Sequence, residues 1–145
     1  MDHAVTASGP TASRAVRDLL ERAVTEQDDN PAEARQLALQ ARVVARADHD
    51  RVGEAEALYR LASLAHASGD PEDAFGLAME ASEIAVATGH QALEAWAVHL
   101  LGVVHYQASN FSDALEHCLR ALELYRATSD GVDAGNILNT IAAIY

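Results

Sequence analysis

The sequence predicts an all-α fold in which antiparallel helix pairs stack into an α-solenoid of about seven helices. Three observations predict it: apolar residues return at the spacing of a helix face, the composition favours helices, and the chain repeats itself every 40 residues. Half of the residues are apolar but only 5% are aromatic. Ala, Leu and Val must therefore build the core, and Ala is favoured in helices but depleted in strands.

The repeat becomes visible when the 145-residue chain is cut at positions 11, 51, 91 and 131, because the blocks then align without a gap. Small residues share columns in the three full blocks, and these columns hold Ala34, Ala74 and Ala114; Ala38, Ala78 and Cys118; and Ala41, Ala81 and Ala121. Small side chains at fixed places let neighbouring helices approach closely. A single helix pair cannot bury its apolar face, so the pairs are expected to stack.

Each full block is expected to hold two helices. In residues 51–90 the first helix has an apolar face made of Leu58, Leu61, Ala62 and Ala65. Gly69 then suits the left-handed position after a helix, Asp70 suits an N-cap, and Pro71 suits the first turn of the second helix. Residues 91–130 repeat this pattern.

The first block departs from the pattern in its first helix. The apolar residues of this helix are rotated by about one step from the later columns, and they are Val16, Leu19, Leu20, Ala23 and Val24. Terminal repeats of such arrays are atypical, so residues 14–50 are interpreted as a capping repeat. Residues 1–13 include a small, polar stretch with Gly9-Pro10, and we expect them to form a flexible N-terminal tail.

Residues 131–145 match only the first helix of a repeat, which makes 14–145 an array that ends halfway through a unit. Such an end exposes an apolar face, which we expect to include Ile141, Ile144 and Tyr145. This predicts the N-terminal part of a longer protein. The alternative is a complete small protein whose last helix packs on a partner chain.

The small-residue columns resemble those of the tetratricopeptide repeat over residues 14–145. The family pattern has Leu, then Gly or Ala, then Tyr in the first helix, and Ala, an aromatic or small residue, and Ala in the second. Two blocks match it apart from the Tyr position, with Leu101, Gly102, Ala114, Cys118 and Ala121 and with Leu61, Ala62, Ala74, Ala78 and Ala81. His105 and Ala65 stand where the family has Tyr, and the period is 40 residues rather than the family's usual length. The resemblance implies a right-handed superhelix whose first helices line a concave groove.

The resemblance also implies which columns face that groove. The predicted groove residues are Glu56, Tyr59, Ser63, His66, Trp96, His99, Val103, Tyr106, Asn136 and Asn139. Aromatic and hydrogen-bonding side chains in this mixture suit an extended peptide or a partner helix. For Tyr59 and Trp96 the alternative is simple packing against the next helix pair. For His99 and Tyr106 we favour ordinary packing over binding.

Composition and motifs exclude several function classes. The net charge of −12 repels nucleic acid and anionic membranes, and no segment is apolar enough to span a bilayer. His99 and His105 would lie on roughly opposite sides of a helix, and no metal-ligand, cofactor or catalytic motif occurs. We therefore expect no enzyme, metal or cofactor within this chain. The single Cys118 and the lack of a signal peptide favour the cytoplasm.

The sequence thus predicts a protein–protein interaction module that binds a peptide or partner protein. The resemblance implies the sensory or scaffolding part of a bacterial signalling protein with a downstream diguanylate cyclase, kinase or transcription-regulator domain. The first alternative is a homodimerisation module that uses the exposed C-terminal helix. The second alternative is a sensor domain for a small ligand.

Overall fold

The computed structural model describes residues 11–128 and 134–145, and within them it is all-helical. Seven helices follow one another in the described part of the chain: α1 (Arg14–Glu26), α2 (Pro31–Ala47), α3 (Arg51–Ala67), α4 (Pro71–Thr88), α5 (Gln91–Gln107), α6 (Phe111–Ala127) and α7 (Ala134–Ile144). Helices α2 to α6 begin at residues 31, 51, 71, 91 and 111, so a helix begins every 20 residues. The predicted all-α array with a 40-residue pair repeat is confirmed.

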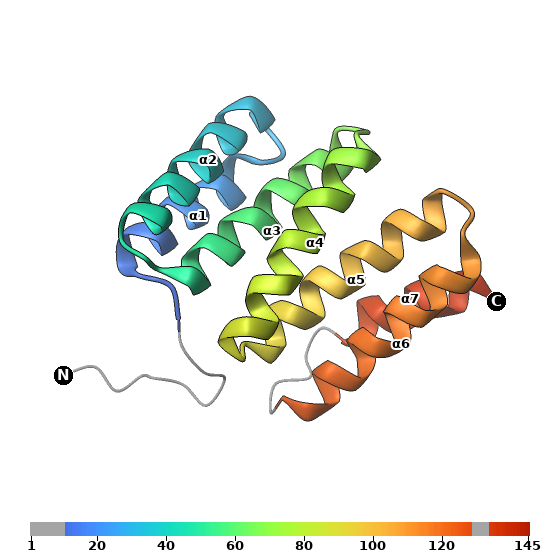
Figure 1. Cartoon of the computed structure of the whole chain (residues 1–145). Coiled ribbons are helices and arrows are strands. Elements are labelled where there is room, and N and C mark those ends of the chain that lie inside the picture. Colours follow the sequence, from blue (N-terminus) through green and yellow to red (C-terminus); the bar gives the residue numbers. More distant parts are fainter. Residues whose placement is uncertain (1–10, 129–133) are drawn as a thin grey trace.

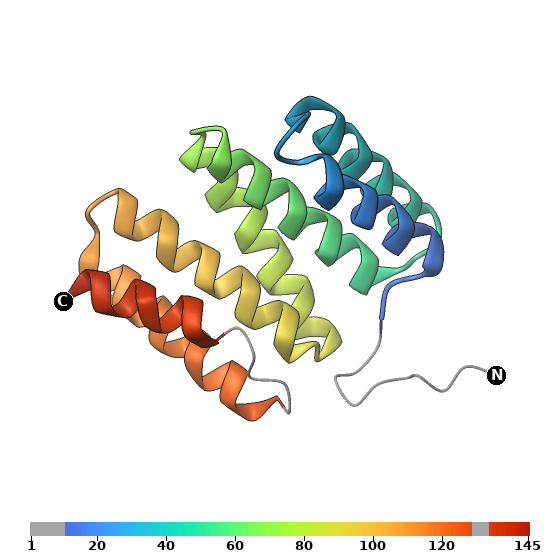
Figure 2. The ribbon, with the colours of Figure 1, turned by 180° about the vertical axis from the view of Figure 1, so that it is seen from behind.

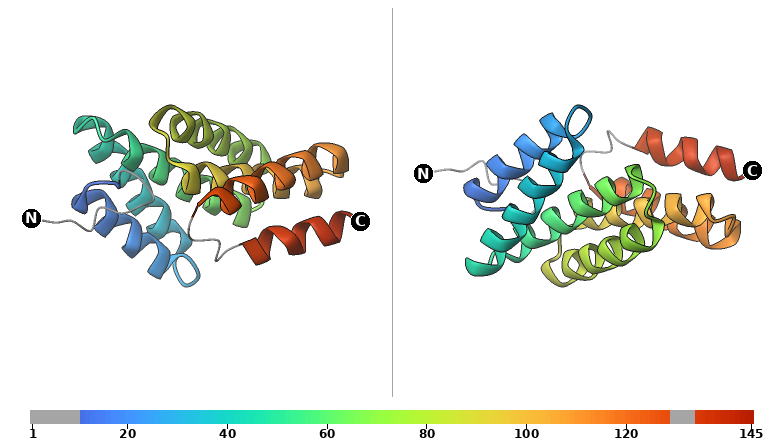
Figure 3. Two further views of the ribbon diagram at one scale, coloured as in Figure 1. Left: turned by 90° about the horizontal axis from the view of Figure 1, so that it is seen from below. Right: turned by 90° about the horizontal axis from the view of Figure 1, so that it is seen from above.

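The helices form a curved stack in which each helix packs mainly against its neighbours in the sequence. Figure 1 looks onto α2, α4 and α6, and Figure 2 shows α1, α3, α5 and α7 from the opposite side. In the views from below and above, where the stack runs across the picture, α1 and α7 lie at the two ends of an arc, on the side opposite α4 (Figure 3). The odd-numbered helices therefore share the concave face.

Helices α1 to α5 each begin directly after a residue whose side chain accepts a hydrogen bond from a backbone N–H of the first turn. The carboxylates of Asp50 and Asp70 accept hydrogen bonds from the backbone N–H three residues later, at 2.9 and 3.1 Å. His90 takes the same column before α5, where its Nδ1 accepts the N–H of Leu93 at 3.2 Å. Such caps satisfy one of the backbone donors that a helix N-terminus leaves free.

The small-residue columns form the contacts between helices. All nine side chains of the three columns at Ala34, Ala38 and Ala41 and their equivalents have an exposed fraction of 0%. Cys118 is one of them, so the free cysteine is a core residue. Because these side chains are short, the even-numbered helices can lie close against their partners.

Residues 11–13 continue the fold before α1. Ala12 is buried, and Ser13 accepts a hydrogen bond from the N–H of Val16 at 3.4 Å. The backbone N–H of Ser13 donates to Oδ2 of Asp50 at 2.8 Å, which ties the start of α1 to the start of α3. The rest of the predicted tail, residues 1–10, lies outside the described residues, as do residues 129–133, between α6 and α7.

Helix α7 packs on α5 and α6 through one apolar face. Ile137 is fully buried, and Ile141 and Ile144 pack with it against a cluster that contains Tyr125. The expectation that Ile141 and Ile144 are exposed is therefore wrong, because their spacing from Ile137 places all three on the inner face. Tyr145 does remain exposed. None of the helices in residues 11–128 and 134–145 combines the length and the apolar character that crossing a bilayer requires.

Candidate functional site

Two adjacent hollows lie on the concave face. The N-terminal hollow has a volume of about 470 Å³ and is lined by Arg17, Leu20, Glu21, Val24, Thr25, Glu56, Tyr59, Arg60, Leu93 and Trp96. The C-terminal hollow has a volume of about 280 Å³ and is lined by Tyr59, Arg60, Trp96, His99, Tyr125 and Asn136. Tyr59, Arg60 and Trp96 belong to both, so the two hollows form one groove, to which α1, α3, α5, α6 and α7 contribute.

The shared wall of the groove is an aromatic pair. The rings of Tyr59, from α3, and Trp96, from α5, lie with centroids 6.0 Å apart and planes inclined by 39°. Both side chains are half-buried and also pack against core residues of neighbouring helices. Tyr59 and Trp96 thus both pack against neighbouring helices and line the groove, which are the two roles that the sequence left open. Packing holds these rings in place, so little side-chain entropy remains to be lost on binding.

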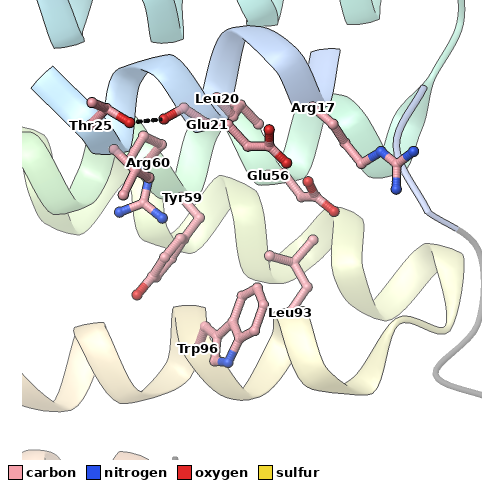
Figure 4. Close-up of a pocket in the computed structure, with 10 residues that line it drawn as sticks. Arg17, Leu20, Glu21, Thr25, Glu56, Tyr59, Arg60, Leu93 and Trp96 are labelled. Atoms are coloured by element: carbon pink, nitrogen blue, oxygen red, sulfur yellow. Dashed lines mark hydrogen bonds between the residues drawn. The ribbon is translucent and has the colours of Figure 1, made fainter. Parts of the chain in front are cut away.

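The N-terminal hollow contains charges of both signs. Glu21 and Glu56 both line this hollow, and in the view of Figure 4 they lie between the guanidinium groups of Arg17 and Arg60. The guanidinium carbon of Arg60 lies 5.6 Å from the ring centroid of Tyr59, which is a cation–π distance. Within the described residues, neither Glu21 nor Glu56 forms a salt bridge.

Glu56 is the carboxylate whose protonation the groove perturbs. Burial raises the pKa of Glu56, and the negative charge of Asp50 raises it further. Arg17 and Arg60 act in the opposite direction without reversing the shift. The carboxylate is therefore poorly solvated, and the nearby arginines do not compensate its charge.

His99 connects the groove to α7. Its Nε2 lies 3.0 Å from Oγ1 of Thr140, and that hydroxyl donates its own hydrogen to the carbonyl oxygen of Asn136 at 3.1 Å. The Thr140 oxygen must therefore accept, which assigns the proton to Nε2 of His99. Burial lowers the pKa of His99, so the ring is held in its neutral form.

The structure distributes the predicted groove residues over three places. Five of them line the groove: Glu56, Tyr59, Trp96, His99 and Asn136. Ser63 and His66 instead line a separate hollow of about 410 Å³ beside the turn between α1 and α2, which shares Arg60 with the groove. Val103, Tyr106 and Asn139 lie outside these three hollows, and the ring of Tyr106 packs 5.7 Å from that of Phe111.

Sequence reasoning missed the contribution of α1, although a signal was present. The apolar face of α1 is rotated by one residue, with Val16, Leu19, Leu20 and Ala23 in place of Ala55, Leu58, Tyr59 and Ala62. The same shift places Arg17, Leu20 and Val24 in the columns of Glu56, Tyr59 and Ser63, and all three line the N-terminal hollow. Arg60 was missed because its column holds Leu100, a buried residue, in the next block.

Other candidate chemistry lies away from the groove. His105 stacks on His117 with ring centroids 5.0 Å apart, and Phe75 meets the edge of His105 at 5.5 Å. No three His, Cys, Asp or Glu side chains in the described ranges are grouped so that they could hold a metal ion. The groove itself presents aromatic, amide and charged side chains on an open surface, a combination that suits reversible binding.

No protein-family model matches the chain, and no curated protein sequence matches it. The side chains of the groove are therefore the basis on which a function can be assigned.

Proposed function

We propose that this chain is a protein-binding module that takes a peptide or a partner helix into its concave groove. The observation that carries the proposal is the continuity of the two hollows through Tyr59, Arg60 and Trp96. A groove that extends from α1 to α7 offers several successive positions for side chains of an elongated ligand. An extended peptide or a helix uses such a surface through anchors at regular spacing.

The chemistry of the groove supports this role. Tyr59 and Trp96 supply large, amphipathic contact surfaces, and residues of these types dominate the binding energy of protein interfaces. Asn136 is exposed at the C-terminal hollow, and its amide can both donate to and accept from a peptide backbone. The resemblance of the repeat columns to tetratricopeptide repeats points to the same kind of ligand.

Selection from a displayed random-peptide library tests the proposal. Trp96 is the only tryptophan of the chain, so the fluorescence of the protein reports directly on the groove. A selected peptide without Trp should shift that emission in a saturable titration. Asn136→Ala and Tyr59→Ala should each weaken binding by about tenfold, which corresponds to about 1.4 kcal/mol.

Two matched controls are available on other surfaces. Asn110 is exposed and its side chain makes no capping hydrogen bond, so Asn110→Ala removes a comparable amide away from the groove. Phe111, with an exposed fraction of 49%, provides the aromatic control Phe111→Ala. If the control variants weaken binding as much as Asn136→Ala and Tyr59→Ala do, the peptide does not bind in the groove and the proposal is wrong.

A small-ligand sensor is the second candidate, and the size of the N-terminal hollow favours it. Its volume of about 470 Å³ falls within the range of small-molecule sites, about 300–1,000 Å³. A ligand of that kind would raise the melting temperature in a metabolite screen. Stabilisation by one metabolite class, without selection of any peptide, would decide for this candidate.

Homodimerisation is the third candidate, and the outer face of α7 favours it. Leu138 and Tyr145 are exposed to 49% and 87%. Light scattering over a concentration series would reveal a dimer, and Leu138→Ser should abolish it. A monomer at all concentrations would exclude this candidate.

A further inference from the structure

The N-terminal hollow has a charge arrangement that selects among partners. The carboxylates of Glu21, on α1, and Glu56, on α3, lie between two arginines and above Leu93 and Trp96 in the view of Figure 4. Arg60 lies over the ring of Tyr59, and Arg17 is solvent-exposed. Both arginines lower the pKa of Glu56, but burial and the charge of Asp50 outweigh them. The face of Trp96 has no such cation in the described part of the chain.

We propose that the N-terminal hollow binds a Lys or Arg side chain of a basic peptide, with the cation between the Glu21 and Glu56 carboxylates and the aromatic wall of Trp96. This inference rests on the proposed peptide-binding function and names the chemistry of the partner. A cation gains both from the carboxylates and from the face of an indole ring, which is the best cation–π acceptor among the side chains.

The long-range field of the protein favours the same partner. The chain carries 22 acidic and 10 basic side chains, a net charge of −12. A field of this sign attracts a basic peptide and raises its association rate, whereas it repels an acidic one. The overall charge therefore favours a basic partner, whereas the hollow itself is lined by two carboxylates and two guanidinium groups.

The destabilisation of the free protein by the charged form of Glu56 supports a binding role. Its raised pKa means that the folded chain holds the proton more tightly than the unfolded chain, whose Glu has a pKa near 4.5. The favourable contribution of this group to stability is complete below that value and is lost as the pH rises through the folded pKa. At neutral pH the charge of Glu56 thus destabilises the fold, and a bound cation would offset that cost.

The test uses three synthetic peptide pools of equal length, whose variable positions contain Lys and Arg, only Ser and Gln, or Asp and Glu. Binding is followed by the fluorescence of Trp96. The basic pool should bind, its affinity should fall with added salt, and the other pools should bind at least tenfold more weakly.

Matched variants separate the hollow from net charge. Glu56→Gln and Glu21→Gln should each weaken binding of the basic pool by about tenfold. Glu83→Gln removes the same charge from an exposed position on α4, outside the hollows of the groove, and should have little effect. Glu56→Gln should also raise the melting temperature at neutral pH, which a residue that only stabilises the fold would not do.

The outcomes distinguish failure of the basic-peptide inference from failure of the peptide-binding function. Preferred binding of the acidic pool would overturn the basic-peptide inference and leave the peptide-binding function standing. An equal loss for Glu83→Gln and Glu56→Gln would also overturn it, because net charge would then explain the preference. Failure of all three pools to bind would contradict the peptide-binding function together with this inference.

Discussion

The sulfur of Cys118 fills the space that a side chain on Gly102 would need. A Cβ added to Gly102, on α5, would lie 2.7 Å from Sγ of Cys118, on α6, and 3.2 Å from the carbonyl oxygen of Ala114. In the preceding pair of helices the same two columns hold Ala62 and Ala78, which are both fully buried. The two helix pairs thus fill the same close contact differently, one with Gly and Cys and the other with two Ala residues.

This relationship predicts a specific energetic coupling. Gly102→Ala should destabilise the protein by about 1–3 kcal/mol, because overpacking a tight helix contact forces the helices apart. Gly102→Ala combined with Cys118→Ala recreates the pair found at positions 62 and 78 and should recover most of that loss. Urea denaturation of the single and double variants measures the coupling.

Gly76 provides the control for helix propensity. It lies inside α4 and an added Cβ would meet no atom within 4 Å. Gly76→Ala should therefore stabilise the protein by about 0.5–1 kcal/mol. If Gly102→Ala is equally stabilising, the close approach of α5 and α6 does not exist as described.

Among the described residues, two turns adopt the left-handed conformation without glycine. His49 and Ser109 have φ angles of +54° and +65°, whereas the equivalent positions in other turns are Gly89 and Gly69. A left-handed conformation costs a non-glycine residue about 1–2 kcal/mol. Substitution by Gly removes this cost, but the greater conformational freedom of Gly in the unfolded chain cancels about 0.4–1 kcal/mol of the resulting gain in stability. His49→Gly and Ser109→Gly should each stabilise the protein by up to about 1 kcal/mol in thermal or urea denaturation. Gly69→Ala and Gly89→Ala should do the opposite, and stabilisation by these reverse changes would refute the explanation.

The cap of α5 should make stability depend on pH. Burial lowers the pKa of His90, outweighing the effect of its own backbone hydrogen bond, and neutral Nδ1 accepts the N–H of Leu93. The unfolded chain, with an ordinary His pKa of 6.5, takes up the proton first as the pH falls. Stability is therefore complete above pH 6.5 and is lost as the pH falls through the lowered pKa.

His90→Asp places in this position the residue that caps α3 and α4. It should reduce the loss of unfolding free energy on acidification, and the remaining loss includes that of His99, whose pKa is also lowered by burial. Histidine NMR titrations of the native protein provide an independent check. An unchanged acid profile in His90→Asp would show that the cap does not control this dependence.

Buried glutamates in one column use different arginines. Glu54 pairs with Arg46 at 3.0 Å and with Arg51 at 2.8 Å, whereas Glu94 pairs with Arg120 at 3.2 Å. Arg120→Ala leaves the buried Glu94 without a salt bridge in the described part of the chain and should cost about 1–2 kcal/mol. Arg46→Ala should cost less, because Arg51 remains. Arg126→Ala, on the exposed side of α6, controls for the change in net charge, and an equal cost for all three variants would exclude the pairing as the cause.

Periodic features of the fold could be predicted from the sequence, and features that depend on contacts between blocks could not. The Ala columns and the Gly69-Asp70-Pro71 turn predicted the helices and their boundaries, because these signals are local. The stacking of His105 on His117 joins residues of different helices that share no column. The inward face of Ile141 and Ile144 depended on Ile137, whose role became clear only when α7 was placed on α5 and α6.

In the candidate site, too, periodic features could be predicted and features that depend on contacts between blocks could not. The repeat columns placed Tyr59 and Trp96 on the same face of α3 and α5, but they did not predict that the two rings meet. Tyr106 was placed in a groove column with packing as the favoured role, and its ring does pack, 5.7 Å from that of Phe111. The rotation of α1 was visible in its apolar residues. The place of Arg17 in the groove could not be predicted, because the one-residue shift of α1 occurs in a single repeat and has no second example that would define it.

Hydrogen–deuterium exchange of the chain with and without a library-selected peptide tests the central claim most directly. The claim is that small-residue packing of the helix pairs creates a concave groove that binds a partner. Added protection should appear in α3 and α5 around Tyr59 and Trp96 and extend to α1 and α7, while α2 and α4 should be unchanged. Protection confined to the outer faces of α2, α4 and α6 would contradict it.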